Sequence, residues 1–208
     1  MTIRHASFLC KTLAAAALLA SSLAATGSAN AALISEIRVT SAVGDFIQVG
    51  ELVATENLTG TNVATGGTAT SNGQYSNPAT DGPSKAIDGN FNQNYYGPGG
   101  IFHSPAPVSS LTDFLDIQLG GTFDLSSATI FGRSDCCTAR NVYNLFFYDA
   151  QGGLVFSQAM VDASGSPGFR ATVQLPAAVP EPTSIALLGL GLLGFAATRR
   201  KPAKSNNA

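Results

Sequence analysis

The sequence holds few of the residues from which enzyme active sites are commonly built. Its 208 residues include two histidines and three cysteines. We find no Ser-His-Asp context, phosphate-binding loop or transition-metal spacing. No pair of carboxylates stands out as the flanking pair that a glycoside hydrolase needs. We therefore expect that this protein is not an enzyme.

Positive charge is also scarce. The segment from Ala32 to Pro180 contains five lysines and arginines against twelve aspartates and glutamates, a net charge of −7. Binding to the phosphate backbone of nucleic acids needs a basic surface, so we expect no nucleic-acid partner. The acidic balance instead suits solubility outside the cell.

The first 31 residues have the pattern of a signal peptide. Arg4 and Lys11 precede an apolar stretch from Thr12 to Ala25, and Ala29-Asn30-Ala31 supplies the small-x-small pattern of a cleavage site. The mature chain is therefore expected to start near residue 32. Cys10 comes before the apolar stretch, where a lipidated cysteine would follow it, so we expect no lipoprotein anchor.

The C-terminal segment 179–208 has three consecutive parts. The motif Pro180-Glu181-Pro182 leads into an apolar run from Ile185 to Ala197, and Arg199-Arg200-Lys201 follows. The apolar region is somewhat shorter than the roughly 20 residues that span a bilayer, but the basic residues provide a cytoplasmic stop. The arrangement closely resembles the PEP-CTERM sorting signal of Gram-negative bacteria that produce exopolysaccharide.

This resemblance implies that an exosortase in the inner membrane recognises the segment and cleaves it near the Pro-Glu-Pro motif. The C-terminal transmembrane helix would anchor the chain in the inner membrane only in transit. Delivery to the cell surface or the extracellular biofilm matrix would follow. A plain single-pass membrane anchor is the alternative interpretation.

Residues 32–178 lie between these ends and are enough for one domain with a sizeable core. Short runs of alternating apolar and polar residues, separated by turn-forming residues, indicate strands. They occur at residues 37–40, 46–49, 114–119, 128–131, 143–148, 153–156 and 171–175. No segment keeps a helical period over several turns, so an all-β sandwich is predicted. The Gly/Asn/Ser-rich segment from Leu58 to Ser104 is either disordered or a set of loops, and its aromatic residues favour packed loops.

A cluster of charged residues and cysteines follows the predicted strand at 128–131. It reads Arg133-Ser134-Asp135-Cys136-Cys137-Thr138, with Arg140 two positions further on. Arginine offers a rigid planar set of donors that suits oxygen-rich ligands. The alternative is that the two arginines only pair with Asp135 as a surface salt-bridge cluster, which contributes little to stability.

The adjacent cysteines Cys136 and Cys137 are the only ones left after removal of the signal peptide. Neighbouring α-carbons lie about 3.8 Å apart, against roughly 5.5–6 Å in ordinary disulfides. A bridge between them closes almost no loop and contributes little chain entropy, so it would serve a surface or a turn. We expect the bridge because an exported protein meets an oxidising compartment; two reduced thiols are the alternative.

The order of several motifs resembles F-type lectins (fucolectins), which share the discoidin-like, galactose-binding-like jelly roll. The resemblance covers residues 34–176. Its motifs are Asn62-Val63-Ala64, Ala86-Ile87-Asp88-Gly89-Asn90, His103-Ser104, the strand at 114–119, and the arginine and cysteine cluster. Phe114-Leu115 stands where the family usually has a tryptophan pair. The resemblance implies a discoidin-like jelly-roll β-sandwich that binds fucose-like sugars.

The family pattern assigns roles to four polar residues. His103 would contact the axial hydroxyl of the sugar, and Arg133 and Arg140 would donate to its ring oxygen and neighbouring hydroxyls. Asp135 would hold the guanidinium groups in place without contacting the ligand.

The same pattern assigns an apolar floor to the site. The disulfide of Cys136 and Cys137 would face the apolar edge of the sugar ring, while Tyr96 and Tyr75 would line a pocket for its methyl group. The alternative for Tyr96 and its neighbour Tyr95 is that both are core aromatics.

The resemblance also implies a structural Ca²⁺ ion. Its ligands would be the carbonyl of Lys85, the side chains of Asp88 and Asn90, and the carbonyl of Gly100, all oxygen donors that suit Ca²⁺. The family adds closing ligands from its last strand, and these are missing here because the sorting segment follows that strand directly. The alternative for Asp88-Gly89-Asn90 is an ordinary turn.

Two functions follow from these observations. The first is a cell-surface or matrix protein that binds carbohydrate or exopolysaccharide. The second is a structural matrix protein that keeps the discoidin-like fold without a working sugar site, which a flat, closed surface at His103, Arg133 and Arg140 would favour. Resemblance of fold does not decide between them.

The tail makes the first testable prediction. We expect residues beyond about Pro182 to be absent from the protein recovered from the cell surface or matrix, because the exosortase cleaves near the motif. Mass spectrometry of the intact surface protein measures its C-terminus directly. Recovery of the chain through Ala208 in that fraction would contradict the sorting interpretation.

Overall fold

Alternating apolar and polar side chains fold the middle of the chain into strands. The computed structural model describes residues 33–106, 113–165 and 167–176. The predicted signal peptide and the predicted C-terminal sorting helix lie outside these residues. Within them, no helix is long and apolar enough to cross a membrane.

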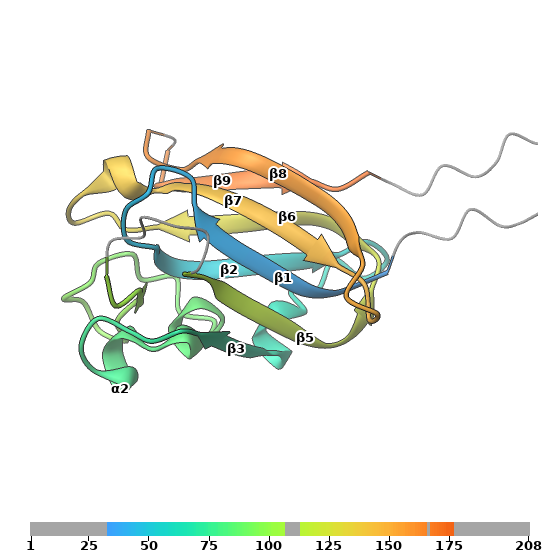
Figure 1. Ribbon diagram of the computed structural model, residues 1–208, viewed down its shortest axis with the longest axis horizontal. Helices are drawn as coiled ribbons and strands as arrows, with labels where there is room; N and C mark the ends of the chain where they lie inside the picture. Colours follow the sequence, from blue (N-terminus) through green and yellow to red (C-terminus); the bar gives the residue numbers. More distant parts are fainter. Residues whose placement is uncertain (1–32, 107–112, 166, 177–208) are drawn as a thin grey trace, which may run out of the picture. The chain divides into compact units, whose positions relative to one another are not determined.

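The described strands form two antiparallel sheets (Figure 1). The first sheet has the order β3 (Thr68–Ser71), β5 (Leu115–Phe123), β1 (Ile34–Ser41), β7 (Val142–Tyr148) and β8 (Leu154–Asp162). The second has the order β4 (Phe102–His103), β2 (Gln48–Glu56), β6 (Leu125–Gly132) and β9 (Arg170–Gln174). The all-β prediction is confirmed, while the jelly-roll assignment stays a prediction.

The core lies between the two sheets because alternate side chains of each strand point inward. Ile37 and Val39 of β1 are fully buried, as are Leu52 of β2 and Ile130 of β6. These residues belong to one continuous hydrophobic cluster that draws on both sheets. Burial of apolar surface at about 25 cal/mol per Å² makes this cluster the main stabilising contribution to the fold.

Each of the seven predicted strands overlaps a strand of the structure, although several are longer than predicted. The segment from Leu58 to Ser104 also carries short elements that the sequence did not indicate. They are η1 (Ala64–Gly66), β3, α2 (Pro78–Asp81), η2 (Pro83–Ala86) and β4. Its residues Ala86 and Ile101 are fully buried, so the segment packs on the core, as its aromatic residues predicted.

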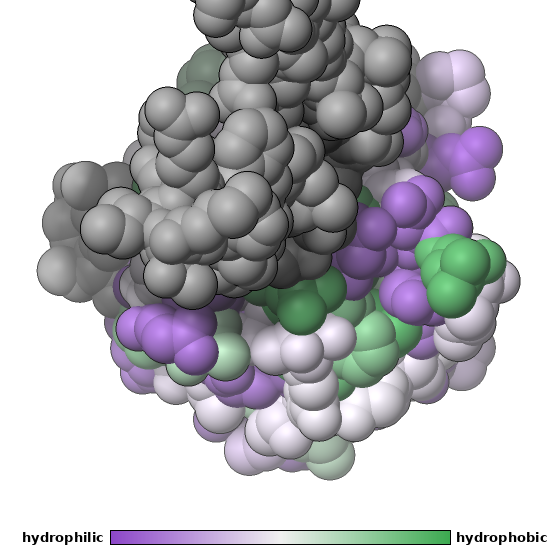
Figure 2. Space-filling model, turned by 90° about the vertical axis from the view of Figure 1, so that its right-hand side faces the viewer, coloured by the Kyte–Doolittle hydropathy of each residue, from purple (hydrophilic) through white to green (hydrophobic). Residues whose placement is uncertain are grey.

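The two ends of the described domain lie on the side opposite the loop between β6 and β7. Ile34 pairs with Phe123, and the backbone of Leu175 bonds to Ser126, so both ends flank the β5–β6 connection. Figure 1 places η3 (Thr138–Arg140) at the other end of the sandwich. Figure 2 shows the molecule from the right-hand side of Figure 1, where the visible surface is mostly polar or weakly polar, with apolar residues near its centre and at one side. The arginine and cysteine cluster therefore lies away from the two ends of the described domain.

One buried hydrogen bond joins the two sheets. The hydroxyl of Tyr143, on β7, donates to the backbone carbonyl of Gln48, on β2, over 2.5 Å. Tyr143 is fully buried, and that burial raises the pKa of its hydroxyl, so the group stays a neutral donor.

This bond makes a stability prediction. Tyr143→Phe should lower the free energy of unfolding by about 1–3 kcal/mol, because it removes the donor and leaves a buried acceptor less well satisfied. Urea unfolding of the exported protein measures the loss. The matched control is Tyr96→Phe, which removes the same hydroxyl from a side chain that is 84% exposed. Equal unfolding free energies for the two variants would contradict the role of the bond.

Candidate functional site

The loop from Arg133 to Asn141 connects β6 to β7 and is closed at its base by one side chain. The amide of Asn141 accepts from the backbone N–H of Arg133 over 3.1 Å and donates to its carbonyl over 2.8 Å. Gly132 permits this approach, since a Cβ there would lie 2.3 Å from Cγ of Asn141. Asn141 itself is fully buried. The loop is therefore held rigidly at the end of β6 and β7.

His103 approaches this loop from β4, which pairs with β2 in the register His103 to Gln48. Its Nδ1 lies 2.9 Å from the carbonyl of Ser104, and its Nε2 lies 2.6 Å from Nε2 of Gln48. The ring is only 4% exposed. Burial lowers the pKa of His103, and the charges of Arg133 and Arg140 lower it further, so the ring is neutral near pH 7.

Arg133 is held by a carboxylate and an aromatic ring. Its Nε and Nη2 donate to the two oxygens of Asp135 over 2.7 and 3.1 Å, and its side chain is 8% exposed. The guanidinium carbon lies 4.8 Å from the ring centre of Tyr95. The hydrogen bonds from Arg133 lower the pKa of Asp135. Asp135 thus orients Arg133, which is the role that the family pattern assigned to it.

Arg140 has a different partner. Its Nε lies 3.1 Å from Oδ2 of Asp45, and its guanidinium lies 5.0 Å from the ring centre of Phe46. The prediction that Asp135 holds both arginines is therefore wrong for Arg140. Neither Asp45 nor Phe46 was predicted, because both lie on the segment before β2, far from Arg140 in sequence. Phe46 also packs edge-on against His103, with the ring centres 4.8 Å apart.

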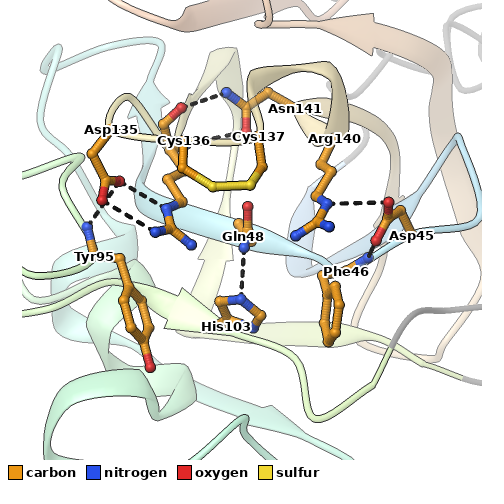
Figure 3. Close-up of a disulfide and its surroundings, with 11 residues drawn as sticks. Asp45, Phe46, Gln48, Tyr95, His103, Asp135, Cys136, Cys137, Arg140 and Asn141 are labelled. Atoms are coloured by element: carbon orange, nitrogen blue, oxygen red, sulfur yellow. Dashed lines mark hydrogen bonds and ion pairs between the residues drawn. A yellow bond between two sulfur atoms is a disulfide. The ribbon is translucent and has the colours of Figure 1, made fainter.

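The two cysteines lie in the same cluster as His103, Arg133 and Arg140. The structure joins Cys136 and Cys137 as a disulfide, and Cys137 has the left-handed backbone conformation, with φ of 59°. In Figure 3 the disulfide lies above Gln48, with Arg140 on one side and Asp135 on the other. His103, Tyr95 and Phe46 lie below it in the same view. Polar donors, a sulfur surface and aromatic rings therefore meet in one place.

The structure separates the roles of the three tyrosines near His103. Tyr96 is 84% exposed, so it is no core residue, and Tyr75 is 55% exposed with its ring 4.6 Å from that of His103. The inner position belongs to Tyr95, whose ring lies 5.4 Å from that of His103 and whose hydroxyl donates to Asp81. The sequence of two adjacent tyrosines does not indicate which side chain is buried and which is exposed.

The predicted calcium residues lie in two adjoining loops. Asp88 accepts from Lys85 Nζ over 3.3 Å and from the backbone N–H of Asn90 over 3.0 Å. Asn90 in turn donates to the carbonyl of Pro98, close to Gly100. These contacts tie the loop at 85–90 to the loop at 98–100.

A further carboxylate lies beneath this loop. Glu51, on β2, is fully buried, accepts from the backbone N–H of Gly89 over 3.3 Å, and has no partner for Oε1. Burial, and then the charge of Asp88, raise the pKa of Glu51 to about 8. Within the described residues no group of three or more His, Cys, Asp or Glu side chains is placed to hold a metal. Carboxylate and carbonyl oxygens are the kinds of ligand that Ca²⁺ prefers, and the calcium ion stays a prediction.

Comparison with known proteins identifies the C-terminal part of the chain. Residues 178–201 match the PEP-CTERM protein-sorting motif. No curated protein and no solved structure matches the chain. The predicted sorting signal is thereby confirmed, and the motif indicates an exported protein that transits the membrane and is processed by an exosortase. The resemblance of the domain to F-type lectins has no support from these comparisons and stays a prediction.

The state of the cysteines in the exported protein can be measured. We expect Cys136 and Cys137 to be bridged to each other, because export places them in an oxidising compartment without another cysteine. Alkylation under non-reducing conditions, followed by mass spectrometry, should then add no label to either residue. Two labelled thiols, or a dimer that reductant dissolves, would contradict this expectation.

Proposed function

We propose that this exosortase-sorted protein binds carbohydrate at the cell surface or in the extracellular matrix, and that its domain takes a fucose-like sugar. One observation carries the proposal. Arg133 and Arg140 come from one loop, His103 comes from a different strand, and the charges of both arginines act on the histidine ring. Side chains distant in sequence thus converge around the disulfide.

The chemistry of this cluster suits a sugar. The guanidinium groups offer planar donors for ring and hydroxyl oxygens. The disulfide and the ring of Phe46 offer apolar surface for the C–H groups of a sugar ring, so polar groups set orientation while apolar groups supply burial. No step of bond breaking is assigned to these residues, and we propose a binding protein, not an enzyme.

The structural matrix protein is the second candidate, and one observation favours it. His103 is 4% exposed with both ring nitrogens engaged, and the side chain of Arg133 is 8% exposed. A ligand therefore needs a side chain around His103 to move. The binding experiment below distinguishes the two candidates.

We also propose that a structural Ca²⁺ ion supports the loop beside the site. Asp88, Asn90 and the carbonyls of Lys85 and Gly100 would hold it, and Glu51 of β2 would supply the closing carboxylate that the terminal strand lacks. The support is the buried, unpartnered Oε1 of Glu51 next to Asp88. A buried carboxylate oxygen without a donor is costly, and a cation satisfies it.

The sugar site makes a prediction for titration calorimetry with L-fucose. A monosaccharide buries little apolar area, so we expect a Kd between about 1 mM and 1 μM, which corresponds to roughly −4 to −8 kcal/mol. Arg140→Ala and Arg133→Ala should each weaken binding about tenfold or more, because a charged hydrogen bond is worth roughly 1.5–3 kcal/mol.

The controls separate binding from stability. Arg140→Ala should leave the melting temperature almost unchanged, because exposed ion pairs contribute little to stability. The side chains of Arg140 and Asp45 are 28% and 36% exposed. Arg38→Ala removes an arginine on β1 that pairs with Asp116 on β5. Neither strand contributes a residue to the cluster, so this variant should not change fucose binding. Absence of fucose binding by the wild type, or full binding by both cluster variants, favours the structural matrix protein instead.

The calcium proposal makes a separate prediction. Millimolar Ca²⁺ should raise the melting temperature of the wild type by several degrees, because an ion that binds only the folded state stabilises it. Glu51→Gln should abolish this rise without destabilising the ion-free protein, because Glu51, whose pKa is raised to about 8, is already mostly protonated and neutral near pH 7 when no ion is bound. Glu36→Gln on β1 is the control and should keep the rise. A wild-type melting temperature that Ca²⁺ does not change would rule the ion out.

A further inference from the structure

Gln48 lies directly beneath the proposed sugar site and is fully buried on β2. The hydroxyl of Tyr143 fixes its backbone carbonyl, and its side-chain nitrogen lies 2.6 Å from Nε2 of His103. Gln48 is therefore held at its backbone and at the nitrogen of its side-chain amide. Nothing in the sequence singled it out, because the pattern of β2 gives it the appearance of an ordinary strand residue.

The orientation of the Gln48 amide follows from its neighbours. The carbonyl of Ser104 can only accept, so the Nδ1 of His103 that faces it carries the proton. His103 is neutral because burial lowers its pKa, so its Nε2 is an acceptor. Gln48 must then present its NH₂ group to His103, and its carbonyl oxygen points away. Figure 3 shows this oxygen directed toward the disulfide.

This carbonyl oxygen, Oε1 of Gln48, is buried and has no hydrogen-bond partner in the structure. Such a group is rare in folded proteins, and each one calls for an explanation. Its surroundings restrict the possible partner. The arginines of the cluster can only donate, whereas Oε1 can only accept. A ligand group that satisfies both must accept and donate at once, which a hydroxyl does and a carboxylate or phosphate oxygen does not.

We propose that Gln48 sets the class of ligand at this site, because its Oε1 accepts a hydrogen bond from a hydroxyl of the bound sugar. Two arginines alone would suit an anion. The lone pairs of Oε1 repel an anionic oxygen that would lie beside Oε1. The site therefore takes neutral, hydroxyl-rich sugars and discriminates against sugar acids and phosphates. This inference rests on the proposed sugar-binding function and refines it.

Access to Oε1 requires a side chain to move, since Gln48 is fully buried. Arg140 is the charged residue of the cluster that moves most easily. Its side chain is 28% exposed and its partner Asp45 is 36% exposed, whereas the side chain of Arg133 is 8% exposed. An exposed ion pair contributes only about 0–1 kcal/mol to stability, so a ligand can separate Arg140 from Asp45 at low cost.

The experiment compares two probes, L-fucose and D-glucuronate, by titration calorimetry on the exported protein and on Gln48→Met. Methionine has a similar length but offers neither the carbonyl acceptor nor the NH₂ donor. We expect the wild type to prefer L-fucose at least tenfold. Gln48→Met should lose about tenfold or more in fucose affinity, and its preference for fucose over glucuronate should shrink. Gln158→Met on the exposed strand β8 is the matched control and should behave as the wild type.

Each other outcome overturns the inference. A wild type that binds glucuronate as tightly as fucose overturns it without any variant, so the test does not depend on the folding of Gln48→Met. A folded Gln48→Met that keeps both affinity and preference overturns the role of Gln48 but leaves the proposed sugar site standing. A wild type that binds neither probe removes the proposed function and the inference together.

Discussion

The arrangement of the candidate site depends on one chain of buried hydrogen bonds. The side chain of Asn141 clamps the backbone of Arg133, and the hydroxyl of Tyr143 lies 3.3 Å from Asn141 and 2.5 Å from the carbonyl of Gln48. The side chain of Gln48 then reaches His103. This chain connects the loop after β6 to strands of both sheets. Buried networks of this kind fix one arrangement, because an unpaired member is costly in a low dielectric.

The charges around this network are balanced in pairs. Asp135 holds Arg133, and Asp45 holds Arg140. His103 stays neutral because burial lowers its pKa, and the charges of both arginines lower it further. The cluster is therefore poor in net charge although it is rich in donors. That combination suits a neutral, oxygen-rich ligand more than an anion. It also agrees with a domain whose net charge is negative and with a C-terminal motif that indicates an exported protein.

The sequence predicted the all-β class and the positions of the main strands, and it named some of the residues that meet in the candidate site. Strand periodicity located the main strands. The short spacing between Arg133 and Arg140 placed these two arginines on one loop. Phe46 and Gln48 were not predicted as site residues because they meet His103 only through pairing of strands some fifty residues apart. Asp45 was not predicted because it meets Arg140, which lies much further along the chain. Glu51 was not predicted as a site residue because its burial depends on a loop that folds over β2. Contacts made by chain topology leave no local pattern in the sequence.

Binding of the exported protein to an array of glycans, with and without Ca²⁺, tests the central claim most directly. The account predicts selective binding to glycans with a terminal fucose-like residue and weak binding to acidic glycans of similar size. The Arg140→Ala variant should lose the signal on the same array. If the wild type binds no glycan under either condition, the converging residues serve only the packing of the domain and the carbohydrate-binding account is wrong.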